Sequence, residues 1–158
     1  MRYHGSEMAR ILSVYLDACA LNRLTDPPSH ARIALEAAAV EQILLSVQAR
    51  RLHWIASLVL RVELARNRDQ GRRETTLGLL QIASEMRSQT RQSLLRGKQL
   101  EKLGFGPFDA LHLAVAEESG CDVLLTTDDR FRKLANRIPG APSVQVRNPL
   151  NYLQEVRP

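Results

Sequence analysis

Four acidic residues stand where strand-like and helix-like patterns of this sequence meet. They are Asp17, Glu63, Asp109 and Asp128. Three of them interrupt or adjoin apolar runs, where an isolated carboxylate is costly unless it gains a partner, a water-filled cleft or a cation. A shared divalent metal would supply that compensation, and ligand sets made only of oxygens favour Mg²⁺ or Mn²⁺. The four acids therefore predict a metal-dependent phosphodiester enzyme.

Short apolar runs predict the strands that must position these acids. The runs lie at 11–16, 52–57, 122–127 and 143–147, and they are typical of short strands bounded by polar residues. In open α/β sheets, ligands gather at the carboxyl ends of the strands, because loops and helix N-termini converge there. Asp17 and Asp128 end two of the runs, so both are expected at that edge.

Helical patterns separate the expected strands. Apolar residues recur at intervals of four and three through 33–47, which is typical of one face of an amphipathic helix, and Ser29 is its expected N-cap. Ser57 is expected to cap a helix that carries Glu63. Further helices are expected as two polar stretches within 72–103, from Pro107 onward, near 131–137 and after 149. This order predicts an α/β fold with parallel strands and helical crossovers.

The predicted positions bring the four acids towards one another. Asp109 begins a helix after a Gly-Pro loop, and Glu63 lies one or two turns into its helix, so both can reach the edge where Asp17 and Asp128 end their strands. Four carboxylates at one place repel unless some are protonated or a cation intervenes. Taken singly, each acid also fits a simpler role: a strand end, a helix N-terminus, a turn or, for Glu63, an ion pair with a neighbouring arginine.

Composition sets the class of protein. At 158 residues, 44% of them hydrophobic, the chain is long enough for one globular core, so 1–158 is expected to be a single domain. No apolar run is long enough to cross a bilayer, and the first residues lack the apolar core of a secretion signal, so a cytoplasmic protein is expected. Cys19 and Cys121 are expected to be reduced, because they are far apart and belong to no CxxC pair.

Positive charge is concentrated in one part of the chain. The net charge is +5, yet the segment 50–96 alone carries ten arginines against four acids, a balance of 10 − 4 = +6. Guanidinium groups contact phosphate bidentately, so this segment suits nucleic-acid binding. The alternative is that arginine serves here as a good helix former on solvated faces. The candidate guides for an RNA backbone are Arg66, Arg68, Arg72 and Arg73.

The acids, in their order and near their spacing, resemble those of PIN-domain ribonucleases. The matching segments are LDACALNRL, VELAR, FDALHLAVA and LLTTDDRF, and the closing VQVRNPLNYL also resembles the family's ending. The resemblance runs from about residue 11 to residue 153. It implies a three-layer α/β/α domain with a central parallel sheet and Mg²⁺- or Mn²⁺-dependent cleavage of RNA to 5′-phosphate and 3′-hydroxyl ends. It also implies that Asp17, Glu63, Asp109 and Asp128 are the metal-site carboxylates.

Residues near the four acids qualify this resemblance. Cys19 stands where many members of the family have Ser, Thr or Asn, so a supporting hydroxyl or amide is missing there. The TxD pattern from Thr126 favours Asp128 as the fourth acid but leaves its neighbour Asp129 open. Asn22 and Thr126 are candidates for supporting the ligands, although turn chemistry accounts for both. His112, one helical turn after Asp109, either faces the cleft or packs against the sheet, and we expect the packing role.

The resemblance also suggests partners. Many small members are toxins of the VapC type, each neutralised by an antitoxin peptide, so the chain is expected to be a toxin that such a peptide restrains by placing Arg or Lys among the carboxylates. Leu44 and Val47 are candidate docking positions for the partner's helix, provided that the core does not bury them. RNA is the expected substrate, and a homodimer is left open. The main rival is a catalytically inactive PIN-fold protein that binds RNA or acts as a scaffold, with Cys19 as the cause.

Other sites fit the sequence less well. The remaining histidines have no ligand-like spacing for zinc. No GxxxxGK[ST] or GxGxxG loop is present. A haloacid-dehalogenase-type phosphatase would need DxD where the chain has LDACA, and a receiver-like phosphoacceptor would need a lysine at the end of a late strand, where the chain has Thr127 or Arg147.

Overall fold

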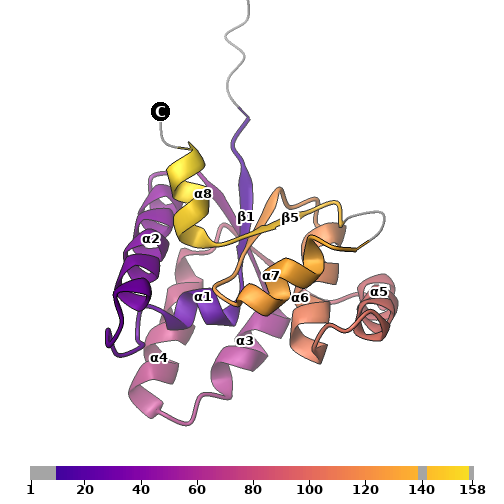
Figure 1. Ribbon diagram of the computed structural model, residues 1–158, viewed down its shortest axis with the longest axis horizontal. Helices are drawn as coiled ribbons and strands as arrows, with labels where there is room; N and C mark the ends of the chain where they lie inside the picture. Colours follow the sequence, from indigo (N-terminus) through magenta and orange to yellow (C-terminus); the bar gives the residue numbers. More distant parts are fainter. Residues whose placement is uncertain (1–9, 139–141, 157–158) are drawn as a thin grey trace, which may run out of the picture.

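All five strands of the central sheet run parallel in the computed structural model, which describes residues 10–138 and 142–156. The sheet order is β3-β2-β1-β4-β5, so the chain starts in the middle and builds outward to both edges (Figure 1). The strands are β1 (Ser13–Leu16), β2 (His53–Ser57), β3 (Glu85–Arg87), β4 (Val123–Leu125) and β5 (Gln145–Arg147). The α/β class with a parallel sheet is confirmed.

Helices cover both faces of the sheet. Because successive strand residues point to opposite faces, Val14 and Leu16 pack into one buried cluster and Tyr15 packs into the other. The first cluster contains residues of α1, α2, α4 and α8, and the second contains residues of α5, α6 and α7; α3 contributes to both. The helices are α1 (Ala18–Asn22), α2 (Ala31–Gln48), α3 (Leu58–Ala65), α4 (Gln70–Leu79), the 3₁₀ turn η1 (Leu80–Ile82), α5 (Arg91–Lys102), α6 (Pro107–Glu118), α7 (Asp129–Ala135) and α8 (Pro149–Val156).

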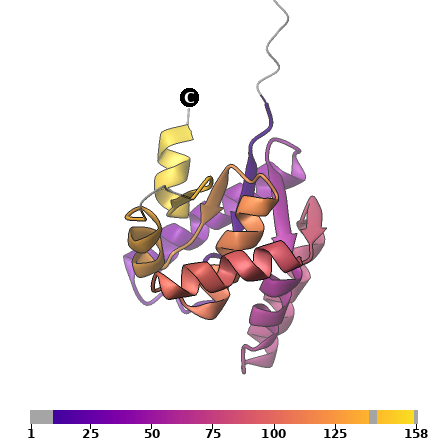
Figure 2. The same cartoon turned by 90° about the vertical axis from the view of Figure 1, so that its right-hand side faces the viewer.

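The layers follow from this alternation. Figure 1 shows α2 and α8 side by side on one face, and Figure 2 shows α5 packed against α6 on the other. The three-layer arrangement expected from the sequence is therefore confirmed. No helix within residues 10–138 and 142–156 is long and apolar enough to cross a membrane.

The segment 72–103 differs from the sequence prediction. Two helical stretches were expected there, but the strand β3 lies between them and pairs in parallel with β2 through Ile55 and Glu85. The sequence of β3 is Glu-Met-Arg, which has no apolar alternation because an edge strand is half exposed and charged side chains protect it from further pairing. A second difference is α1, which begins directly after Asp17 and which the sequence did not reveal.

The long helix α2 also corrects two expectations. It begins at Ala31 with His30 at the N-cap position and without a side-chain cap, so Ser29 is not the cap. Leu44 and Val47 are each only 5% exposed and belong to the core beneath the helix. The condition for their use as docking positions for a partner helix is therefore not met, whereas the amphipathic face that predicted the helix is confirmed. Ser57 does cap α3, with its hydroxyl accepting the Leu60 N–H at 3.0 Å.

Candidate functional site

Asp17 lies at the end of β1 and caps α1. Its Oδ1 accepts the Ala20 N–H at 2.9 Å, and its backbone N–H donates to the Leu125 carbonyl, so both neighbouring elements fix its place. The residue is 1% exposed, and its Oδ2 has no hydrogen-bond partner of normal geometry in the described part of the chain. Burial raises the Asp17 pKa to about 7; the nearby Thr126 hydroxyl opposes the rise and the Asp109 charge adds to it.

Asp109 lies in the first turn of α6, immediately after the loop 104–106. Burial raises the pKa of the Asp109 carboxyl to about 6, with His112 opposing the shift and the charges of Asp128 and Glu63 adding to it. Both the Asp17 and Asp109 carboxyls therefore gain protons more readily than a free aspartate. This is the expected behaviour of acids that share a low-dielectric site without a counter-ion.

Glu63 is in the second turn of α3, with 29% of its side chain exposed. The sequence left open an ion pair with Arg61 or Arg66, but its partner is His112, whose Nε2 lies 2.7 Å from Glu63 Oε1. Arg66 instead places its guanidinium carbon 5.3 Å from the centre of the Phe108 ring. Glu63 is thus held by a side chain from α6, the helix that carries Asp109.

Asp128 and Asp129 are separated by their partners. Asp128 caps α7 by accepting the Phe131 N–H at 3.1 Å, and its own N–H donates to Thr126 Oγ1 at 3.1 Å. Asp129 receives two hydrogen bonds of 2.8 Å each from Arg32, which lowers the Asp129 pKa. The Asp128 charge, by contrast, acts on Asp109. Asp128 is therefore the acid of this pair that belongs with the other three.

The charges of all four acids affect the pKa of the Cys19 thiol. The residue is exposed, yet protein atoms crowd its thiol, so that desolvation raises the Cys19 pKa well above its usual value. Negative charges add to this effect, and they come from Asp17, Asp109, Glu63 and Asp128. The four acids are therefore close enough to Cys19 for their charges to act on a single thiol. Within residues 10–138 and 142–156, no three His, Cys, Asp or Glu side chains already converge as ligands around a single metal ion.

The other predicted residues are the two candidates for supporting the ligands and the four candidate RNA-binding arginines. Thr126 is buried and positions Asp128, and Asn22 has a buried Oδ1 without a hydrogen-bond partner among the residues described. Of the four arginines, Arg72 binds Asp26 and Thr25, and Arg73 donates to the Asn67 carbonyl at 2.8 Å. Arg66 and Arg68 are exposed. The structure thus commits two of the four guanidinium groups, those of Arg72 and Arg73, to hydrogen bonds within the protein.

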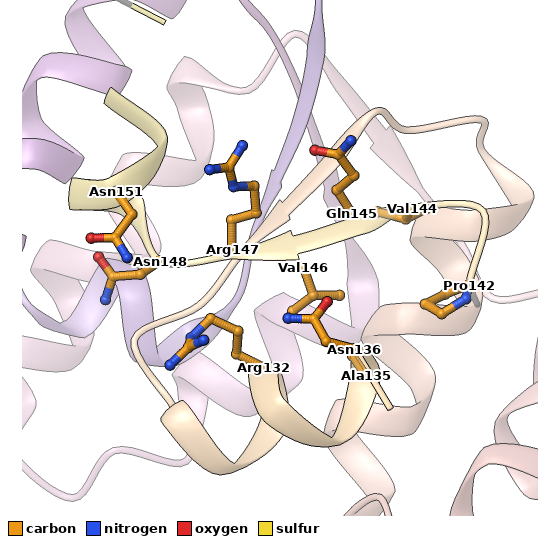
Figure 3. A pocket seen from close by; sticks show the side chains of 10 residues that line it. All are labelled: Arg132, Ala135, Asn136, Pro142, Val144, Gln145, Val146, Arg147, Asn148 and Asn151. Carbon is orange, nitrogen blue, oxygen red and sulfur yellow. The ribbon is translucent and has the colours of Figure 1, made fainter. Parts of the chain in front are cut away.

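Two cavities are candidates for a substrate site. One of about 200 Å³ borders the acids, since Asp109, Asp128 and Arg130 are among its lining residues. The other, of about 390 Å³, lies between α7, β5 and α8 and is lined by Arg132, Arg147 and several amide side chains (Figure 3). Arg132 pairs with Asp129 and Arg147 pairs with Glu155, so the second cavity adds little uncompensated positive charge. The first cavity is the better candidate for a substrate beside the acids.

Sequence reasoning missed three residues that support the site. Tyr15, Ser57 and His112 form buried contacts that end at Glu63, whereas the sequence favoured a packing role for His112 and left a place in the cleft open. The spacing of His112 one turn after Asp109 was a signal that it could face the same way. Tyr15 carried no such signal, because the residue lies 97 positions before its histidine partner.

Comparison with known proteins establishes the family. Residues 14–137 match the PIN domain family, and the chain belongs to it. PIN domains are generally nucleases. A search of curated protein sequences gave no match.

Solved structures share the fold. VapBC2 from Rickettsia felis, bound to a DNA fragment from its promoter, is similar with a TM-score of 0.58 and 13% identity, covering 87% of this chain and 98% of that one. VapC20 from Mycobacterium tuberculosis, a toxin that cleaves the sarcin–ricin loop, gives a TM-score of 0.56 at 14% identity, covering 84% and 98%. FitAcB from Neisseria gonorrhoeae gives 0.55 at 15% identity, covering 86% and 97%.

Proposed function

We propose that this chain is a Mg²⁺- or Mn²⁺-dependent endoribonuclease whose site is formed by Asp17, Glu63, Asp109 and Asp128. The observation that carries the proposal is Asp17 Oδ2, a buried carboxylate oxygen without a hydrogen-bond partner of normal geometry in the described structure. It lies in the electrostatic field of Asp109, and Asn22 Oδ1, nearby in the sequence, is also buried without a hydrogen-bond partner among the residues described. A site of oxygen donors with uncompensated negative charge suits a hard divalent cation.

The residues present fit such a cation. The four carboxylates would hold it, and a bound Mg²⁺ or Mn²⁺ would lower the pKa of a water molecule and stabilise charge on the phosphoryl oxygens. The chain's own contribution is to orient the acids. Backbone N–H groups fix Asp17 and Asp128 as helix caps, and His112 fixes Glu63. Arg66 and Arg68, the two exposed residues among the four candidate arginines, are the proposed guides for the RNA backbone.

Cleavage of RNA by the purified chain tests this proposal. We expect cleavage with Mn²⁺ or Mg²⁺, loss of cleavage with a chelator, and 5′-phosphate and 3′-hydroxyl product ends. Asp17→Asn and Asp109→Asn should each reduce the rate at least about a hundredfold, since even the hydrogen-bond partners of metal ligands are worth about 10- to 100-fold. Glu101→Gln, which changes an exposed acid of α5, is the matched control. Equal rates for all four proteins would contradict the assignment.

We further propose that the chain is the toxin of a toxin–antitoxin pair, with RNA as its substrate. The similar structures include a VapBC2 complex and a toxin that cleaves the sarcin–ricin loop. A partner peptide that places Arg or Lys among the four acids would neutralise the charge that the fold leaves uncompensated. Because Leu44 and Val47 lie in the core, exposed apolar residues such as Leu35 and Leu45, each 53% exposed, are the available positions on α2.

Induction in a bacterial host separates the toxin from its rival. The rival is an inactive PIN-fold RNA-binding or scaffold protein, and the observation that favours it is Cys19, which offers no supporting hydroxyl beside the acids. A toxin should stop growth and degrade RNA, and Asp17→Asn should relieve both effects. Normal growth and intact RNA in cells that accumulate the folded wild-type chain would support the scaffold instead.

A further inference from the structure

A chain of buried hydrogen bonds leads from the core to Glu63. The Ser57 hydroxyl lies 2.5 Å from the Tyr15 hydroxyl, which lies 2.6 Å from His112 Nδ1, and His112 Nε2 lies 2.7 Å from Glu63 Oε1. Tyr15, Ser57 and His112 are each 0% exposed. The residues come from β1, β2, α6 and α3, so the chain joins four elements at the edge where the acids gather.

The donors in this chain can be assigned from their partners. Ser57 Oγ accepts the Leu60 N–H at 3.0 Å, so its own proton is available for Tyr15. The Tyr15 proton then goes to His112 Nδ1, and the remaining imidazole proton is on Nε2, where it donates to Glu63. Burial raises the pKa of the Tyr15 hydroxyl well above its usual value, which keeps Tyr15 protonated and able to donate. In this direction every hydroxyl and ring nitrogen of the chain has a partner.

Glu63 is held by a hydrogen bond from a side chain, whereas Asp17 and Asp128 are held by the backbone. Asp17 and Asp128 are held by backbone N–H groups of the helices that they cap. The Glu63 side chain is longer, 29% exposed, and receives its hydrogen bond from His112. The His112 ring is itself fixed, since Phe108 stacks on it at 6.3 Å and the Tyr15 ring lies 5.5 Å away.

We propose that Tyr15 and His112 are positioning residues that fix the Glu63 carboxylate in the orientation in which it binds a divalent cation. The proposal rests on the metal-dependent function proposed above. Tyr15 sets the imidazole tautomer, and His112 donates to one Glu63 oxygen so that the other stays free for the cation. Groups that orient metal-binding carboxylates in this way are typically worth about 10- to 100-fold in metal affinity or activity.

A matched pair of substitutions tests the role of His112. In Gln the amide nitrogen can take the place of Nε2 and still donate to Glu63, whereas in Asn it takes the place of Nδ1 and falls short. We expect Mn²⁺ affinity, measured by titration calorimetry without RNA, to fall about 10- to 100-fold in His112→Asn and to be largely retained in His112→Gln. Equal losses in the two variants, or no loss in either, would overturn the positioning role. Circular dichroism and thermal melts in the absence of metal identify a variant that fails to fold.

Nitrogen NMR of the imidazole gives a second readout that needs neither metal nor activity. The wild-type protein should show His112 as the Nε2–H tautomer, and Tyr15→Phe, which keeps the ring and removes only the hydroxyl, should release this preference and weaken Mn²⁺ binding. The Nδ1–H tautomer in wild type would refute the proposed direction of the chain. If wild type shows the expected tautomer yet binds no Mn²⁺, the metal-dependent function fails while the orientation of Glu63 by His112 is supported.

Discussion

Two carboxylates of this protein are equally buried and have opposite surroundings. Glu36 on α2 and Asp17 after β1 are each 1% exposed. Glu36 receives hydrogen bonds from Arg23 at 2.9 Å, Arg32 at 3.3 Å and Asn148 at 2.5 Å. Asp17 receives one from the Ala20 N–H, and its second oxygen has no partner of normal geometry in the described structure.

The difference separates a structural acid from a functional one. A buried charge needs a counter-charge and a full set of hydrogen bonds, and the chain supplies both to Glu36. Around Asp17 the nearby charged groups include Asp109, whose negative charge makes burial harder. A fold able to place two arginines on one buried acid leaves another uncompensated at the edge where ligands gather. This contrast is the physical reason to expect a cation at Asp17 and none at Glu36.

The largest predicted effect is the loss of stability when the structural acid, Glu36, is removed. Glu36→Ala removes the common partner of Arg23, Arg32 and Asn148, and breaking a buried pair costs about 3–5 kcal/mol of the free energy of unfolding. Urea denaturation measures this loss. Glu41→Ala, at an exposed position of the same helix, should change the free energy by less than about 0.5 kcal/mol. A loss below about 1 kcal/mol for Glu36→Ala would show that its ion pairs are weak.

The next largest effect is a pH dependence that belongs to Asp17. Its pKa is about 7 in the folded state and 3.8 in the unfolded reference, so the folded protein binds the proton more tightly. The resulting stability is complete below pH 3.8 and is lost as pH rises through about 7, by at most about 4 kcal/mol. Asp109, with a pKa of about 6, acts in the same direction.

Denaturation of the metal-free protein between pH 4 and 8 measures this dependence. Asp17→Asn should remove most of the decline with pH and leave the protein at least as stable as wild type at pH 8, since Asn has no charge to bury and keeps an oxygen for the Ala20 N–H. Wild type that gains stability across this range would show that Asp17 is compensated in a way the structure does not contain.

The same comparison shows what the sequence could and could not predict. Interruption of apolar runs identified Asp17, Asp109 and Asp128, because a strand end or helix start is a local property of the pattern. Glu36 carried no such signal, because its helix has an ordinary amphipathic pattern and two of its partners, Arg23 and Asn148, lie outside that helix. The choice between Asp128 and Asp129 likewise depended on Arg32, which is 97 residues away.

The fold followed the same rule. The four apolar strands could be predicted because each has its own hydrophobic pattern, whereas β3 has the sequence Glu-Met-Arg and is a strand only because β2 offers it a parallel edge. The hydrogen bond between Tyr15 and His112 joins strand β1 to helix α6, which packs on the face of the sheet to which Tyr15 points, so it required the assembled layers. Features set by local periodicity could be predicted, and features set by pairing across the sheet could not.

A divalent cation should give Asp17 the counter-charge that Glu36 already has, and it should therefore stabilise the folded protein. At a Mn²⁺ concentration about 100 times its dissociation constant, binding to the folded state stabilises the protein by about 2.7 kcal/mol. Thermal melts should therefore shift upward in wild type and in the control Glu101→Gln, and they should not shift in Asp17→Asn or Asp109→Asn. Equal shifts in all four proteins would place the Mn²⁺ elsewhere.

The smallest predicted effect is on RNA binding, and it compares arginines that are paired within the protein with arginines that are exposed. Arg72 is held by Asp26 and Thr25, whereas Arg68 is exposed and Arg66 lies over Phe108. An arginine already paired within the protein has less to offer a phosphate, so the exposed pair should carry the contacts to RNA.

Each phosphate contact on a single strand contributes about −0.7 to the slope of log affinity against log salt concentration. Replacing Arg66 and Arg68 by Gln in an Asp17→Asn background, which prevents cleavage, should flatten that slope by about 1.4 in fluorescence anisotropy titrations. Arg72→Gln should leave the slope within about 0.3 and lower the unfolding free energy instead, because it removes a partner of Asp26. If Arg72→Gln flattens the slope and the double variant does not, exposure is the wrong guide to the RNA path, and the Asp26 pair must open when RNA binds.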